Sequence, residues 1–89
     1  MDEAEVRDKV GAYRTILAGS YTAAQYPSKQ MAPSAEDMAG HLLWLFGEID
    51  GLLDSGQLDA AVRRLDFAQG VLWAAGGFSL NGMRAYGAI

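Results

Sequence analysis

The feature that most limits how this chain can fold is its stretch from Phe67 to Met83, which contains no charged side chain. A chain of 89 residues buries only about two-thirds of the surface that its unfolded form exposes. Half of the residues are apolar, and there is no cysteine from which a disulfide could stabilise a small core. An oligomer interface is a common source of additional burial in such domains. We therefore expect the chain to associate with copies of itself.

The overall composition indicates a single domain over residues 1–89. The formal net charge of −4 disfavours binding to duplex DNA, because such binding relies on a basic protein face. The uncharged stretch is rich in Gly, Gln, Ser and Asn, whereas a membrane span needs about 20 mostly apolar residues. The acidic residues Asp2, Glu3 and Glu5 also differ from the basic start of a signal peptide. We therefore expect a cytoplasmic protein without a DNA or membrane partner.

The charges are unevenly distributed along the chain. No acidic residue occurs from Lys9 to Ala35, although the protein as a whole is acidic. A locally cationic segment that also carries tyrosines suits a small anionic ligand with aromatic rings, whereas the alternative is a loop that lacks acids by chance. The basic and tyrosine residues of this segment are Lys9, Arg14 and Lys29 with Tyr13, Tyr21 and Tyr26.

Three segments have the apolar spacing of amphipathic helices. The first covers residues 3–18, where acidic residues at the start suit the helix dipole. The second follows Ser34, an N-cap residue with Asp37 three positions later, and stops at residues 54–56. The third covers residues 58–75. The expected core-facing residues of the first helix are Val6, Val10, Tyr13 and Leu17.

Turn-forming residues separate these helices. Pro27 and Pro33 disfavour a helical residue before them, so the connection between the first two helices should be a turn-rich or extended crossing. A short last helix is expected from Ser79, and no segment alternates long enough to form a strand. The sequence therefore predicts an all-α fold. It is a small helical bundle, or a hairpin of two long antiparallel helices with shorter N- and C-terminal helices, in an oligomer.

The sequence lacks the residue patterns of common catalytic and metal sites. His41 is the sole histidine and there is no cysteine, so Cys–His chemistry is excluded. Structural zinc sites normally use four nitrogen or sulfur ligands. We expect neither enzymatic activity nor a metal or cofactor, and interpret His41 as an ordinary helix-surface or interface histidine. Trp44 and Trp73 lie beside leucines at helical spacing and are expected in the core or in an interface.

The motif Phe-x-Gln-Gly-x-Leu-Trp occupies residues 67–73, after the helical segment 59–66 and after His-Leu-Leu-Trp at residues 41–44. Gly-Phe-Ser-Leu follows at residues 77–80. Together these segments resemble the phage anti-CBASS cyclic-oligonucleotide sponges. The resemblance is looser in the N-terminal half, where it rests on a tyrosine of the first helix and on Pro-Ser-Lys-Gln at residues 27–30.

The resemblance implies a compact helical protein that assembles into hexamers. Members of this family bind cyclic dinucleotides such as cyclic GMP-AMP, and in some cases cyclic trinucleotides, without cleaving them. By holding the messenger, they prevent it from activating the cell-killing effector of the host. The resemblance therefore implies a non-catalytic immune-evasion protein in the cytoplasm of the infected bacterial host, with cyclic dinucleotides and its own copies as partners.

The resemblance also implies which residues contact the ligand. Tyr13 matches a tyrosine that stacks on a base, and Lys29 matches a lysine that meets the phosphates. Base stacking on an aromatic ring contributes about 1–3 kcal/mol, and an ammonium is a point-charge partner for a phosphate. Arg14 and Ser28 complete this candidate set. A second candidate set consists of Arg63, Arg64 and Gln69.

The residue pattern leaves alternatives open at these positions. Tyr13 lies on the apolar stripe of the first helix and is therefore also a candidate core residue. Tyr26, three residues before Lys29, is the alternative base-stacking aromatic. Arg14 lies off the stripe, where it joins the phosphate contacts or is simply solvated.

A protein-interaction module is the alternative function. A small acidic protein with exposed apolar surface can bind a partner protein through that surface. Such a phage-encoded inhibitor or assembly factor would use the segment Phe67–Phe78 or the acidic face of the second and third helices.

Overall fold

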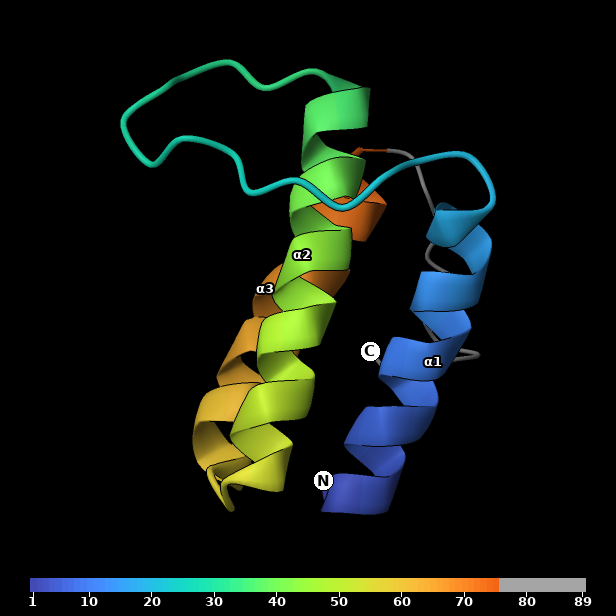
Figure 1. The fold of residues 1–89 in the computed structure, drawn as a ribbon, viewed down its shortest axis with the longest axis vertical. Coiled ribbons are helices and arrows are strands. Elements are labelled where there is room, and N and C mark those ends of the chain that lie inside the picture. The colour runs from blue at the N-terminus through green and yellow to red at the C-terminus, as the bar shows by residue number, and fades with distance from the viewer. Residues whose placement is uncertain (76–89) are drawn as a thin grey trace.

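The computed structural model describes residues 1–75 and contains three helices in that range. Helix α1 covers Glu3–Ala18, α2 covers Ala35–Asp54 and α3 covers Leu58–Ala74. The helices pack into a bundle in which α3 lies along α2 and α1 lies beside them (Figure 1). The all-α prediction is confirmed for these residues. The short helix expected from Ser79 lies outside the described residues, as does the second part of the uncharged stretch.

Local sequence signals explain where the helices begin. At α1, the Asp2 side chain accepts a hydrogen bond from the Glu5 amide at 2.8 Å, and the Glu5 side chain accepts one from the Asp2 amide. At α2, the Ser34 hydroxyl accepts from the Asp37 amide at 3.1 Å, and the Asp37 carboxylate accepts from the Ser34 amide at 3.0 Å. Each reciprocal pair satisfies backbone donors that the helix itself leaves free. The predicted Ser34 cap is confirmed.

The core forms where the apolar faces of the three helices meet. The predicted stripe of α1 is buried along its whole length. Trp44 is half-buried and packs against the core, whereas Trp73 is 52% exposed on α3. Trp44 therefore has the expected core position, and an interface position for Trp73 stays a prediction. The buried side chains of the core include Val6, Val10, Tyr13, Leu17, Phe46, Ile49 and Leu65.

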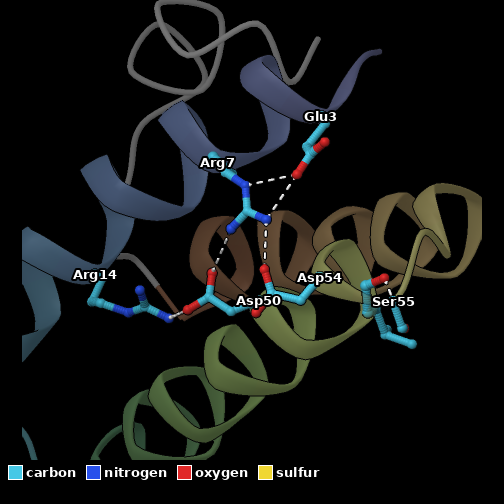
Figure 2. A network of polar contacts seen from close by, with 7 residues as sticks. Glu3, Arg7, Arg14, Asp50, Asp54 and Ser55 are labelled. Atoms are coloured by element: carbon cyan, nitrogen blue, oxygen red, sulfur yellow. Dashed lines mark hydrogen bonds and ion pairs between the residues drawn. The ribbon is translucent and has the colours of Figure 1, made fainter.

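Ion pairs join α1 to α2 on the outside of the bundle (Figure 2). Arg7 donates to Asp54 at 2.9 Å and Arg14 donates to Asp50 at 2.8 Å, and both pairs link α1 to α2. Within α1, the Arg7 guanidinium also donates to Glu3 at 2.8 Å. Hydrogen bonds to Glu3 and then to Asp54 raise the pKa of Arg7 above its ordinary value. Because ion pairs that face water stabilise a protein only weakly, these contacts mainly orient α1 against α2.

The connection between α1 and α2, residues 19–34, contains no helix or strand, and we name it the strap. It crosses α2, loops away from the bundle and returns to the start of α2 (Figure 1). Within the loop, the Gln30 amide donates to the Pro27 carbonyl at 3.1 Å, and Ala32 has a φ of 58°, which is uncommon for a residue with a side chain. The expected turn-rich crossing is confirmed.

The strap is fastened to α2 by two hydrogen bonds near its midpoint. The Ala24 amide donates to the Gly40 carbonyl at 3.0 Å, and the Tyr26 amide donates to Nδ1 of His41 at 3.1 Å. Gly40 allows this approach, because a Cβ there would lie only 3.0 Å from the Thr22 carbonyl oxygen. A glycine followed by a histidine in α2 thus determines where the strap lies.

Candidate functional site

A groove of about 280 Å³ lies between the strap, the first turns of α2, and α3. Its lining is mostly apolar, with a few polar groups among hydrophobic and aromatic side chains, as is common in small-molecule sites. The strap contributes Tyr26 and Ser28, α2 contributes Asp37 and His41, and α3 contributes Phe67.

Aromatic rings from different elements meet at this groove. Tyr26 is half-buried, and its hydroxyl donates to the Met31 carbonyl at 3.3 Å, which holds the ring within the strap. Phe67 is 57% exposed although it is a large apolar residue. The His41 ring lies 5.2 Å from the Trp44 ring, measured between centroids. The groove can therefore offer apolar and aromatic surface to a planar group.

The strap also forms a second hollow, lined by residues 25–29. Ser28 lines both the groove and this hollow. Lys29 is exposed and lines the hollow but not the groove. The carboxylate in the groove lining belongs to Asp37, which already accepts the Ser34 amide in the helix cap. An anionic group is therefore favoured beside Lys29 and disfavoured beside Asp37.

Tyr13 lies in the core and has no exposed surface. Its ring stacks on that of Phe46 with centroids 6.3 Å apart, and its hydroxyl accepts a hydrogen bond from Nε2 of Gln69 at 3.0 Å. In this arrangement the Tyr13 ring cannot stack on a base. The ligand contact that the resemblance implies for Tyr13 is therefore not possible. The alternative drawn from the apolar stripe, that Tyr13 is a core residue, is confirmed. Tyr26 is the tyrosine that shares the hollow with Lys29.

The other candidate residues are not gathered at the groove. Arg14 is engaged with Asp50 on the outside of the bundle, with 38% of its side chain exposed. Arg63 lines a separate hollow at the start of α3, and Arg64 donates to a backbone carbonyl one turn earlier in the same helix. Gln69 is 6% exposed and bonded inside the core. The second candidate set therefore does not form one site on this chain.

His41 and Phe67 line the groove, although the sequence does not single out either of them as a ligand-binding residue. The sequence indicates an ordinary helix-surface or interface position for His41, and the structure adds that His41 lines the groove and accepts a hydrogen bond from the strap. A signal for it was present, because Gly40 places a residue without a side chain at mid-helix directly beside it. For Phe67, the signal is the start of the uncharged stretch immediately after Asp66.

Residues 1–75 contain no group of three or more His, Cys, Asp or Glu side chains placed to hold a metal ion. None of the helices within these residues is long and apolar enough to cross a bilayer. Comparisons with protein families, curated proteins and solved structures found no match to this chain.

Proposed function

We propose that this protein binds and sequesters a cyclic dinucleotide through the groove and the adjacent strap. The observation that carries the proposal is the meeting of an aromatic-lined groove with Ser28 and the exposed Lys29 on one short segment. The ligand class has aromatic bases joined by phosphates, and these two surfaces complement the two parts. The resemblance to phage sponges supports the same ligand. The protein would then act in the cytoplasm of an infected bacterium by withholding an immune messenger.

The site consists of an aromatic groove and a cationic part of the strap, and this arrangement suggests how the ligand is oriented. A base enters the groove, where Tyr26 and Phe67 provide aromatic surface and stacking contributes about 1–3 kcal/mol. The phosphates remain at the strap, where Lys29 supplies a positive charge and Ser28 a hydroxyl donor. Asp37 inside the groove reinforces this orientation, because its negative charge repels phosphate.

The ligand class supports a shared binding site. A cyclic dinucleotide carries two bases, and the groove of about 280 Å³ provides one aromatic-lined recess on each copy of the chain. We therefore propose that one copy of the chain holds one base and that a second copy holds the other. A symmetric contact repeats every residue of the site, which suits a ligand with two-fold symmetry. A closed oligomer, with six copies as the family resemblance implies, would present several such sites.

Calorimetry of the purified protein with cyclic dinucleotides tests this proposal, with linear dinucleotides as the comparison. Lys29→Ala is expected to weaken binding about tenfold, while Lys9→Ala, the matched loss of a lysine on α1, leaves it unchanged. Tyr26→Ala is expected to weaken binding at least about fivefold, because it removes a stacking surface. Wild-type affinity in both strap variants would refute the site.

Recovery of the ligand separates sequestration from catalysis. The complex is heated to denature the protein, and the released nucleotide is analysed by chromatography. Intact cyclic dinucleotide supports sequestration, whereas a linear product would identify an enzyme and overturn the proposed mechanism.

A protein-interaction module remains the second candidate function, supported by exposed apolar side chains. Phe67 and Trp73 on α3 are 57% and 52% exposed, and Ile16 on α1 is 47% exposed. A sponge should be a closed oligomer that carries nucleotide absorbance when purified from cells that make cyclic dinucleotides. A module that binds a partner protein would instead show no bound nucleotide, and its binding would be lost in Trp73→Ala rather than in Lys29→Ala.

A further inference from the structure

We propose that His41 is a pH-sensitive latch that holds the strap against α2 and thereby keeps one wall of the groove in place. The observation behind this proposal is the hydrogen bond from the Tyr26 amide to Nδ1 of His41 at 3.1 Å. Tyr26 and His41 also both line the groove. The latch follows from the geometry of the strap alone and does not depend on which ligand the groove binds.

The bond specifies the protonation state of the imidazole. Nδ1 can accept the Tyr26 amide only through its lone pair, so the ring must be neutral with its proton on Nε2. A second proton would occupy Nδ1 and point at the amide hydrogen. Two donors would then face each other, and the hydrogen bond would be replaced by repulsion. Histidine is the side chain that ordinarily makes this change between about pH 5 and 8.

Charged and titratable groups lie near His41 on α2 and on the strap. On its own helix, Asp37 lies one turn earlier and lines the same groove, where its carboxylate accepts the Ser34 amide. From the strap, the groove lining includes the phenol of Tyr26, while Lys29 lies in the neighbouring hollow. From α3, the described lining residues are Phe67 and Val71, which carry no charge. Carboxyl and phenol groups ordinarily titrate outside this pH range.

Release of the latch should affect a defined part of the strap. The bond from the Ala24 amide to the Gly40 carbonyl contains no titrating group and persists in acid. Pro27, which follows Tyr26, has no amide hydrogen with which to replace the lost contact. The segment that moves away from α2 when this bond is lost therefore begins after Ala24 and includes Tyr26 and Ser28 of the groove wall. Because the closed strap requires neutral His41, acid favours the open strap and base favours the closed one.

Amide hydrogen exchange of the protein without ligand tests the latch. Protection of the Tyr26 amide is measured by NMR at about pH 7.5 and about pH 5.5, relative to the intrinsic exchange rate at each pH. We expect protection to fall at least about fivefold in acid, the effect of losing one hydrogen bond. The Ile49 amide in the buried part of α2 should keep its protection, which excludes general unfolding.

Two substitutions of His41 provide matched controls. His41→Asn keeps an acceptor near the position of Nδ1 that does not titrate, so Tyr26 should stay protected at both pH values. His41→Leu removes the acceptor, so Tyr26 should be unprotected at both. Equal protection of wild-type Tyr26 at the two pH values would overturn the proposal. A fall in His41→Asn as large as that in the wild type would also overturn it, because another group would then be responsible.

Discussion

Alanine substitutions at two glycines of α2, Gly47 and Gly40, distinguish the intrinsic helix preference of alanine from the effect of the contact between α2 and the strap. Gly47 is exposed, and a Cβ there would meet no atom within 4 Å. Gly47→Ala should therefore gain the intrinsic helix preference of alanine, about 1 kcal/mol. Gly40 lies in the same helix, but a Cβ there would lie 3.0 Å from the Thr22 carbonyl oxygen. Because this neighbour is a backbone atom, the strap itself must move in Gly40→Ala.

The size of the difference follows from the bonds that hold the strap. Moving the strap weakens the bond from Ala24 to Gly40 and the bond from Tyr26 to His41. Each contributes about 0.5–1.5 kcal/mol, so their loss equals or exceeds the gain in helix preference of about 1 kcal/mol. We expect Gly40→Ala to leave the free energy of unfolding unchanged or to lower it by up to about 2 kcal/mol.

Thermal unfolding followed by far-UV circular dichroism measures this difference. For a domain of this size, 1 kcal/mol corresponds to roughly 4–8 °C in Tm, so the gain in Gly47→Ala is readily detected. Gly51→Ala is a second control, because a Cβ at Gly51 would also meet nothing within 4 Å. A Tm for Gly40→Ala as high as that for Gly47→Ala would refute the reasoning, because the strap could not then lie against α2 at Gly40.

Three further substitutions test the core, the cap and the ion pairs. Tyr13→Phe removes the acceptor of the buried Gln69 amide and should lower the free energy of unfolding by about 1–3 kcal/mol in urea denaturation, whereas an unchanged value would contradict this bond. Ser34→Ala should cost about 1 kcal/mol in the same assay, and Ser34→Asp, which keeps an acceptor at the N-cap, should cost less. Asp50→Asn weakens a pair with Arg14 whose side chains are 37% and 38% exposed, so the loss should stay below about 1 kcal/mol and shrink in high salt. A loss that does not depend on salt would argue against an electrostatic contribution.

The helices can be predicted from sequence because their signals are local. Ser34 and Asp37 are three residues apart, and the cap that they form depends on little else. The stripe of α1, including Tyr13, has helical spacing, and the structure buries it. For Tyr13, the apolar spacing predicts the buried position correctly, whereas the resemblance implies a ligand contact at a side chain that has no exposed surface.

The site is less predictable because it is assembled by contacts between distant parts of the chain. The bond that places the strap joins Tyr26 to His41 across 15 residues, and no spacing rule links an amide in a loop to a particular helix residue. Lys29 could be selected from the acid-free segment, but its nearness to a groove depends on where the strap crosses α2. Phe67 becomes a groove residue only because α3 packs along α2.

The groove and the latch meet at Tyr26, whose amide bonds to His41 and whose side chain lines the groove. A ligand that requires the closed strap must favour the neutral form of His41, because binding and protonation are reciprocally linked. Binding near the titration range of histidine should then release protons, and acid should weaken it. Calorimetry in two buffers of different ionisation enthalpy measures that release. His41→Asn should bind the ligand at about pH 7.5 without releasing protons. Tight binding by the wild type without proton release would refute this link between the groove and the latch, because the base would then enter the groove whether or not the strap is closed.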